Sequence, residues 1–214
     1  PTIEVLHDLY LLCPRSNMFK NNCSCKRQCV ECAAFRVGYR EHSRKLRAFV
    51  GVSNYIVERF RDNGYFSGVD SYVINNAREI PDPGKKIVEA AAGNIRFGYI
   101  GTINKAKGVE WLIDQFVSRS IPGKLLIAGS GDSSYVDELR RKAENSSISF
   151  LGYQNPKDFF SNIDVCIVPS MWPDTFPAVA YEACAYRVPV IASKIGGLPE
   201  IINEGVNGLY CNPD

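Results

Sequence analysis

Residues 164–193 decide the fold, and they read DVCIVPSMWPDTFPAVAYEACAYRVPVIAS. The apolar run 165–168 is typical of a buried strand, and residues 188–192 form a second such run. The pattern of residues 176–186 predicts a helix between the two strands, for which Thr175 is a suitable N-cap. Parallel strands need a long crossover connection, usually a helix, so this order predicts a parallel strand–helix–strand unit.

The same alternation extends outward in both directions. Further strands are predicted at residues 2–6, 49–53, 71–75, 95–100, 124–128, 148–151 and 208–211, and helices at 54–60, 108–118, 134–143, 156–162 and 195–203. Such alternation predicts an α/β fold, a parallel sheet covered by helices on both faces. Ligands of these sheets bind in the loops at the carboxyl ends of the strands.

The composition is that of a folded globular chain. Of 214 residues, 45% are hydrophobic and 22% are charged, which excludes a mainly disordered chain and a coiled coil. No apolar run approaches the ~20 residues that a membrane-spanning helix needs, and no signal peptide is visible. We therefore expect a location in the reducing cytoplasm.

Both ends of the chain look cut. The sequence starts at Pro1 without a Met and ends in the turn-like residues 212–214, so we expect a piece of a longer protein. Residues 1–60 are expected to be the tail end of one domain and residues 61–214 a second domain. The best linker candidate is the Pro/Gly-containing stretch 82–86.

Charge is unevenly distributed. The net charge is +2, but residues 1–60 carry ten Lys and Arg against five Asp and Glu. This surplus favours acidic partners or an anionic membrane surface, and a solvated helical face is the alternative. No nucleic-acid partner is expected, because zinc-finger spacing, RNA-reading aromatic motifs and a sustained basic stripe are all missing.

Five of the eight cysteines lie within residues 13–32. In a reducing compartment such a cluster favours a metal or plain thiols, whereas a disulfide staple belongs to secreted chains. The pair Cys29 and Cys32 has the spacing of a zinc knuckle. We predict a structural zinc held by Cys13, Cys23, Cys29 and Cys32, with Cys25 as the alternative to Cys23; disulfides and plain thiols remain open.

Residues 101–108, Gly-Thr-Ile-Asn-Lys-Ala-Lys-Gly, run from a predicted strand into a predicted helix. Glycine lets the backbone approach a ligand closely, and the helix start offers free N–H groups. Lys105 and Lys107 add positive charge. These features favour a diphosphate cradle, with a polar turn as the alternative, and the Gly-Lys-Ser/Thr of a Walker loop is missing.

Two carboxylates lie close to the helix that follows Thr175. Asp174 precedes it, and Glu182 interrupts its apolar face. A buried carboxylate needs a partner, for which sugar hydroxyls are suitable; a nearby backbone group is the alternative for Glu182. The N–H groups of Phe176 and Ala178, at the helix start, are available to an anion.

Together these segments resemble the retaining glycosyltransferases of the GT-B fold, specifically glycosyltransferase family 4, also called group 1. The resemblance covers about residues 49–212, and the start His7-Asp8-Leu9-Tyr10-Leu11-Leu12-Cys13-Pro14-Arg15 resembles a subgroup of the family. The matching segments are Phe49-Val50-Gly51-Val52-Ser53, Tyr99-Ile100-Gly101, Lys107-Gly108-Val109, Leu126-Ile127-Ala128-Gly129-Ser130-Gly131, Asp164 to Ser170, Asp174 to Pro177, Glu182-Ala183, Pro189 to Ser193, Gly196 to Glu200 and Asn207-Gly208. The resemblance implies a Rossmann-like sheet, the C-terminal half of a GT-B fold, plus a remnant of the first domain.

The resemblance also implies that the C-terminal domain binds a nucleotide-diphosphate sugar. By position, Glu182 would bind the ribose hydroxyls, and Gly101 and Lys107 would contact the diphosphate. Gly152 and Tyr153 would face the base. The implied donor-binding residues are Gly101, Thr102, Lys105, Gly152, Tyr153, Phe176, Pro177, Ala178 and Glu182. Of these, Phe176, Pro177 and Ala178 would contact the donor through their backbone.

The implied catalytic residues are His7, Asp174 and Lys107. His7 matches a histidine of the first domain that touches the donor sugar, although a lone histidine is more often structural. Two departures weaken the match. Thr102 stands where the family commonly has Arg, so Lys105 or Lys107 must carry more of the charge. Asp174 stands where the family often has Glu, which is one methylene longer.

The expected function is transfer of a sugar, with retention of configuration, to a glycan or lipid-linked glycan. No cofactor is expected to be required for catalysis. Most of the acceptor site would lie in the first domain, so this chain alone is expected to be inactive. That domain would also provide a peripheral contact with the inner face of the membrane. A sugar-nucleotide epimerase and a non-catalytic sugar-nucleotide-binding module are the alternatives.

Overall fold

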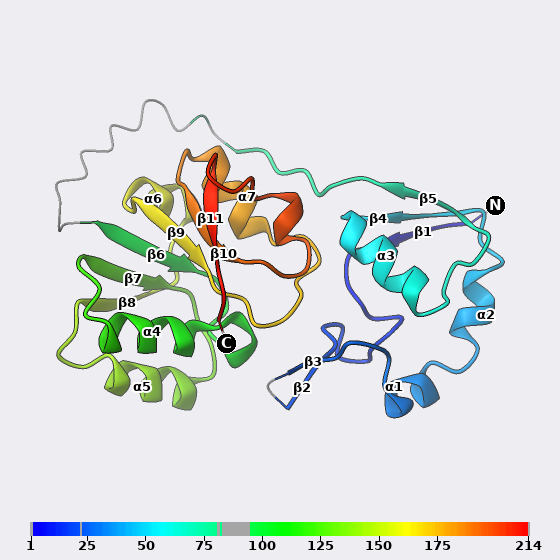
Figure 1. Cartoon of the computed structure of the whole chain (residues 1–214), viewed down its shortest axis with the longest axis horizontal. Helices are drawn as coiled ribbons and strands as arrows, with labels where there is room; N and C mark the ends of the chain where they lie inside the picture. The colour runs from blue at the N-terminus through cyan, green and yellow to red at the C-terminus, as the bar shows by residue number, and fades with distance from the viewer. Residues whose placement is uncertain (1, 22, 81, 83–94, 214) are drawn as a thin grey trace. The chain divides into compact units, whose positions relative to one another are not determined.

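The computed structural model describes residues 2–21, 23–80, 82 and 95–213. The chain forms two compact units (Figure 1). Unit 1 comprises Pro1–Arg78, Trp172–Pro177 and Ile195–Glu200, and unit 2 comprises Glu79–Met171, Ala178–Lys194 and Ile201–Asp214. Of the expected linker 82–86, only Asp82 lies within the described residues.

Unit 1 contains a three-stranded parallel sheet in the order β1–β4–β5, formed by β1 (Ile3–Leu6), β4 (Ala48–Gly51) and β5 (Asp70–Val73). We expected a domain boundary after residue 60; instead unit 1 continues to Arg78, because β5 pairs with β4 along its whole length.

One helix covers the core of this sheet. Helix α3 (Asn54–Asp62) is capped by Ser53, whose hydroxyl accepts a hydrogen bond from the Ile56 N–H at 3.3 Å. Its apolar face packs into a buried cluster in which the rings of Phe49 and Phe66 stack 4.2 Å apart. The strands predicted at 2–6 and 49–53 and the helix predicted at 54–60 are confirmed within two residues at their ends.

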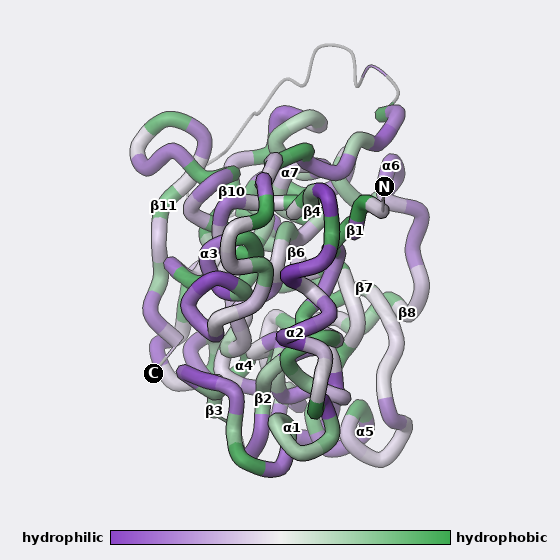
Figure 2. The backbone as a smooth tube through the Cα atoms, turned by 90° about the vertical axis from the view of Figure 1, so that its right-hand side faces the viewer, coloured by the Kyte–Doolittle hydropathy of each residue, from purple (hydrophilic) through white to green (hydrophobic). Residues whose placement is uncertain are grey.

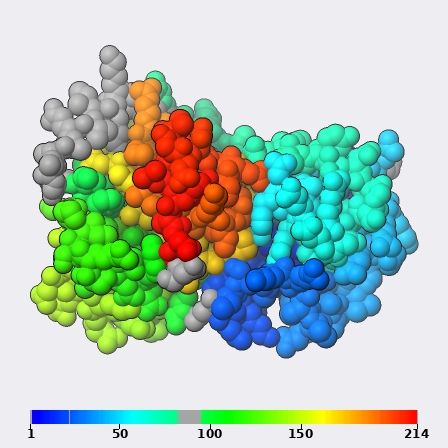
Figure 3. All heavy atoms as spheres, viewed as in Figure 1, coloured from blue at the N-terminus to red at the C-terminus, as the bar shows by residue number. Residues whose placement is uncertain are grey.

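Residues 13–35, hereafter the cysteine segment, lie at the surface of unit 1, coloured deep blue in Figure 3. The segment contains the antiparallel pair β2 (Phe19–Lys20) and β3 (Cys23–Ser24) and the helix α1 (Val30–Phe35). Helix α2 (Tyr39–Ser43) follows. The sequence predicted none of these elements, because they are too short to show hydrophobic periodicity and α1 buries no residue.

Unit 2 is built on a six-stranded sheet in the order β11–β10–β9–β6–β7–β8, and all its neighbouring strands are parallel. The strands are β6 (Arg96–Ile100), β7 (Lys124–Ala128), β8 (Ile148–Gly152), β9 (Val165–Val168), β10 (Val190–Ser193) and β11 (Gly208–Cys211). The parallel sheet predicted from strand–helix alternation is therefore confirmed.

Helices cover both faces of this sheet, as predicted (Figure 1). Helices α4 (Val109–Ser118) and α5 (Ser133–Lys142) lie on one face, where Ile113 and Leu139 join a buried cluster with Leu125 and Ile127 of β7. Helices α6 (Pro156–Ser161) and α7 (Ala178–Ala185) are joined by the stacked rings of Phe160 and Tyr186. The strands they enclose are mainly apolar, as β7 shows in Figure 2. Among the described residues, no helix has the length and apolarity to cross a bilayer.

Two local predictions are wrong. The helix predicted at 195–203 is only the 3₁₀ turn η2 (Leu198–Glu200), because the Gly197 N–H binds the Asp174 carbonyl at 2.8 Å and diverts the chain. Helix α7 begins at Ala178 rather than at residue 176, and Thr175 does not cap it. The Thr175 hydroxyl instead donates to the carbonyl of His7 at 2.7 Å.

Candidate functional site

The strand order of unit 2 contains a switch point. From β6 the chain adds β7 and β8 on one side, whereas β9, β10 and β11 are added on the other. At such a point two neighbouring loops diverge and leave a crevice at the carboxyl ends of the strands. The loops that follow Ile100 of β6 and Val168 of β9 therefore define the candidate site.

These two loops are joined through their backbones. The first loop contains the 3₁₀ turn η1 (Lys105–Lys107), and the Ala106 carbonyl accepts a hydrogen bond from the Met171 N–H at 2.8 Å. Gly108 has a left-handed φ of 72°, and a Cβ on it would lie 1.9 Å from the Pro169 carbonyl oxygen. Only glycine therefore allows this approach of the two loops.

Glycines also bring together the ends of β6, β7 and β8. A Cβ on Gly129 would lie 1.8 Å from the carbonyl oxygen of Gly101, and the Gly129 N–H binds the Gly152 carbonyl at 2.7 Å. The predicted donor-binding residues Gly101 and Gly152 therefore lie at one edge of the sheet. Thr102 is exposed beside the first and Tyr153, 85% exposed, beside the second.

Two cationic side chains lie just before helix α4. Lys105 is exposed, with its Nζ 5.9 Å from the centre of the Tyr135 ring, and Lys107 is half-buried. The N-terminus of a helix carries partial positive charge, so cations there are unfavourable by about 0.3–1 kcal/mol each. A bound anion would relieve this repulsion, which makes the loop a plausible place for a diphosphate.

Glu182 is buried in helix α7, with only 6% of its surface exposed. The helix reads Ala-Val-Ala-Tyr-Glu-Ala-Cys-Ala, and its small residues let it pack closely on β9 and β10. The carboxylate lies near Cys166 of β9, and it adds to the effect of burial in raising the pKa of that thiol. A carboxylate in this position can accept hydrogen bonds from hydroxyl groups of a ligand.

Ser170 is a polar residue for which the sequence analysis predicted no role. It follows Pro169, which is the first residue after β9. Its side chain is buried, with 1% of the residue exposed, and its Oγ has no hydrogen-bond partner among the described residues. A buried hydroxyl without a partner is costly, so its position at the switch point makes it a candidate ligand contact. The signal in the sequence was a polar residue two positions after the end of a buried strand.

The remaining predicted site residues belong to unit 1, apart from Ala178, which begins α7 in unit 2. The Ser53 hydroxyl donates to the Thr175 carbonyl at 2.6 Å, and Thr175 in turn binds the carbonyl of His7. These bonds hold residues 172–177, which include Asp174, Phe176 and Pro177, at the carboxyl edge of β1 and β4. The structure thus brings His7 together with the loop that carries Asp174, and His7 is exposed.

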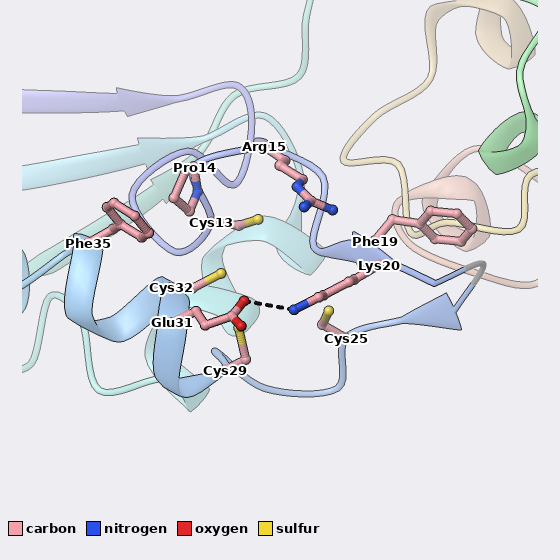
Figure 4. A pocket seen from close by; sticks show the side chains of 10 residues that line it. All are labelled: Cys13, Pro14, Arg15, Phe19, Lys20, Cys25, Cys29, Glu31, Cys32 and Phe35. Atoms are coloured by element: carbon pink, nitrogen blue, oxygen red, sulfur yellow. Dashed lines mark hydrogen bonds and ion pairs between the residues drawn. The ribbon is translucent and has the colours of Figure 1, made fainter.

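Four cysteines line one cavity of unit 1: Cys13, Cys25, Cys29 and Cys32 (Figure 4). Cys23, which we placed in the predicted zinc set, is exposed on β3 and is not among the residues lining this cavity. Cys25 takes its place because its N–H binds the carbonyl of the buried Met18 at 2.7 Å, which turns this part of the chain inward. All eight cysteines are free.

The parallel sheet, its switch point and its glycine-lined loops define a Rossmann-like protein of the GT-B glycosyltransferase type. The family model of the glycosyl transferases group 1 matches residues 94–214, more than half of the chain. The chain belongs to this family, as the sequence resemblance predicted.

Curated relatives are consistent with this family. A protein of Klebsiella pneumoniae described as an uncharacterized 42.6 kDa protein in the cps region is 26% identical over 203 residues, 93% of this chain and 52% of the relative. The GDP-mannose-dependent alpha-mannosyltransferase of Corynebacterium glutamicum is 29% identical over 175 residues, 75% of this chain and 39% of that enzyme. The chain thus spans about half or less of these relatives.

Solved structures share the fold. Anabaena Alr3699/HepE, crystallised with UDP and glucose, matches with a TM-score of 0.74 and 23% identity over 100% of this chain and 58% of its own. Sucrose-phosphate synthase from Thermosynechococcus elongatus matches with a TM-score of 0.73 and 20% identity over 99% of this chain and 55% of its own.

Proposed function

We propose that this protein transfers a sugar from a nucleotide-diphosphate sugar to a glycan or lipid-linked glycan, with retention of configuration. The observation that carries the proposal is the loop 101–108, which is closed onto residues 169–171 at the switch point of the sheet and carries two lysines. The buried carboxylate of Glu182 adds an acceptor for sugar hydroxyls.

Relatives support a nucleotide-sugar donor. HepE is seen in complex with UDP-glucose, and the corynebacterial relative is described as GDP-mannose-dependent. These two differ in base and sugar, so the donor of this protein is to be determined by experiment. The Klebsiella relatives are described as proteins in the cps region, which supports a glycan acceptor. The cytoplasmic location and peripheral membrane contact stay predictions.

The chemistry depends on charge that develops on the leaving diphosphate. As the glycosidic bond breaks, Lys107 and Lys105 stabilise this charge together with N–H groups at the start of α4, and Gly101 leaves room for the phosphate. Thr102 supplies no cation where the family commonly has Arg, so the two lysines carry the charge. Glu182 accepts hydrogen bonds from the ribose, and Gly152 and Tyr153 face the base.

The remaining residues act on the sugar and the phosphate. His7 contacts the donor sugar, and Asp174 binds its hydroxyls with a side chain one methylene shorter than the family's Glu. Phe176, Pro177 and Ala178 present backbone to the sugar and phosphate. This scheme needs no metal ion in the transfer step.

A thermal-shift screen of the 214-residue chain tests donor binding. UDP-, GDP-, ADP- and dTDP-linked sugars are compared, each against its free monosaccharide. A ligand at a hundred times its Kd stabilises by about 2.7 kcal/mol, so one nucleotide series should raise the Tm clearly. If no nucleotide sugar shifts the Tm, the proposed donor site is wrong.

Transfer is tested with a radiolabelled donor. Lys107→Ala should lower kcat by about 10²–10³-fold, the effect of removing one group that stabilises transition-state charge. Lys124→Ala is the matched control, because that exposed lysine lies at the opposite, amino-terminal end of β7. A labelled glycoside supports transfer, an interconverted sugar nucleotide would indicate an epimerase, and binding without turnover a non-catalytic module.

A further inference from the structure

The cavity that the four cysteines line has a volume of about 140 Å³ (Figure 4). Its thiols come from three separate stretches of the cysteine segment. Cys13 ends the turn after β1, Cys25 directly follows β3, and Cys29 and Cys32 lie at the start of α1, where Cys29 is the N-cap. These three stretches meet at the cavity, and Cys13, Cys25 and Cys32 also contact the buried cluster of unit 1.

Two of these thiols belong to one turn of helix. Cys29 is the N-cap of α1 and Cys32 is its third residue, so both side chains lie at the start of this helix. Cys13 and Cys25 border the same cavity from other stretches. Zn–S bonds of about 2.3 Å in a tetrahedron place neighbouring sulfurs about 3.8 Å apart, a separation within reach of a hydrogen bond between thiols. A zinc ion would therefore need the four sulfurs to lie this close around one position.

In the described ranges no three His, Cys, Asp or Glu side chains are yet arranged around a metal position. Each cysteine side chain turns about a single bond, χ1, so zinc binding would first require these side chains to rotate toward one position.

The cysteine segment buries few of its side chains, although Gln28 donates hydrogen bonds to the Asn63 side chain and the Leu12 carbonyl. Of its described residues only Cys13 and Met18 are buried, whereas Val30 and Phe35 are 87% and 75% exposed. An isolated two-stranded hairpin is marginal in water, and so is a helix of six residues. Small units with so little apolar burial usually need disulfides or a metal.

The surroundings suit a negatively charged metal–thiolate centre. Four thiolates around Zn²⁺ carry a net charge of −2, and Arg15 and Lys20 line the same cavity. Lys20 is also paired with Glu31 at 2.7 Å, in an exposed ion pair. Arg59 donates to the Cys25 carbonyl and acts electrostatically on its thiol. The Arg59 Nε is buried and has no hydrogen-bond partner among the described residues, so it is available to a thiolate.

We propose that Cys13, Cys25, Cys29 and Cys32 bind one zinc ion, which holds the cysteine segment on unit 1. The arrangement favours zinc over a disulfide because a disulfide joins only two of the four thiols. This site lies in unit 1 and does not depend on the proposed sugar transfer, so either proposal can fail without the other.

The test compares two serine variants of the 214-residue chain, purified with zinc and reductant and then freed of loose metal by gel filtration. Elemental analysis of the unaltered chain should give about one zinc per chain. Cys25→Ser should fall to roughly a tenth of that content, because three thiolates bind zinc less tightly. Cys23→Ser is the matched control, since Cys23 lies two residues away and outside the cavity lining; it should keep its zinc.

Two further measurements do not depend on the folding of a variant. Stripping the metal with a chelator should lower the Tm of the unaltered chain, and added zinc should restore it. Cobalt(II) should produce the intense thiolate-to-metal charge-transfer absorption of a four-sulfur site. The proposal is overturned by a zinc-free chain that gives no such absorption, by equal zinc loss in both variants, by bound iron in place of zinc, or by a Cys29–Cys32 disulfide in the reduced preparation.

Discussion

At the scale of single residues, Glu182 lies where burial opposes its charge. A carboxylate that is 6% exposed in an alanine-rich helix must be compensated by polar partners. A ligand with vicinal hydroxyls would add such partners, and a charged hydrogen bond is worth about 1.5–3 kcal/mol. The contribution of Glu182 to binding is therefore measurable apart from its contribution to the fold.

Glu182→Gln should raise the Kd of the nucleotide that gives the largest Tm shift by about 10- to 100-fold. The amide keeps the size of the side chain but accepts hydrogen bonds without the charge. Isothermal titration calorimetry measures the effect, and Glu144→Gln is the control, since Glu144 is exposed beyond the end of α5. An unchanged Kd for Glu182→Gln would refute the ribose role.

Ser170 and Ser53 are both buried, but they differ in their hydrogen bonds. Ser170 Oγ has no partner among the described residues, whereas Ser53 Oγ caps α3 and binds the Thr175 carbonyl. Ser170→Ala should therefore leave the free energy of unfolding unchanged or raise it by about 1 kcal/mol, while Ser53→Ala should lower it by about 1–2 kcal/mol. Urea unfolding measures both.

If Ser170→Ala destabilises the chain as much as Ser53→Ala, the hydroxyl has an internal partner and is not held for a ligand. If Ser170→Ala keeps its stability and also binds the donor more weakly, the serine belongs to the site.

At the scale of elements, Gly108 fixes the loop between β6 and α4. Its left-handed backbone satisfies the turn, and its missing side chain admits the Pro169 carbonyl. The loop after β6 and the loop after β9 can lie in contact only while both conditions hold. The shape of the proposed phosphate site therefore depends on the absence of a side chain at Gly108.

Gly108→Ala should destabilise unit 2 and weaken donor binding. Gly205→Ala is a matched control, because Gly205 also has a left-handed φ, of 79°, but nothing lies within 4 Å of its added Cβ. In the control, backbone strain alone should lower the free energy of unfolding by about 1–2 kcal/mol. Gly108→Ala should lower it distinctly more, because its Cβ would also clash with the Pro169 carbonyl. Equal losses in urea unfolding would show that the two loops separate without cost.

Residues 195–203 show why some elements were predicted wrongly. Residues 195–203 have a glycine-started pattern typical of a helix, yet Glu200 turns its carboxylate to the N–H groups of Asn54 and Tyr55, at 2.8 and 2.7 Å. These partners lie 146 and 145 residues away in sequence. A tertiary contact with a helix N-terminus thus outweighs the local preference, and no sequence window contains both partners.

At the scale of the whole molecule, ligand binding should leave a distinct map of hydrogen-exchange protection. With the nucleotide sugar identified in the thermal-shift screen, protection should rise in residues 101–108, 152–154 and 178–182. Residues 139–142, at the end of α5, should change little, because they lie at the opposite end of this helix from its start, which follows the carboxyl end of β7. Protection confined to residues 139–142 would place the ligand elsewhere.

The sequence by itself determined the sheet of unit 2 and the loops that carry its proposed site. Apolar strands and amphipathic helices are local patterns, read within about ten residues, and they survive in any tertiary context that buries them. Thus the limits of β7, β9 and β11 agree with the sequence, and Gly101, Lys105 and Lys107 lie in the loop that the sequence selected.

Only the tertiary structure decided which segments meet. It assigned residues 172–177 and 195–200 to unit 1, selected Cys25 over Cys23 for the cavity, and bound Thr175 to the carbonyl of His7. These contacts join groups that are far apart in the chain, or depend on which way one side chain turns. These contacts follow from the packing of the folded chain, because no local pattern of residues predicts them.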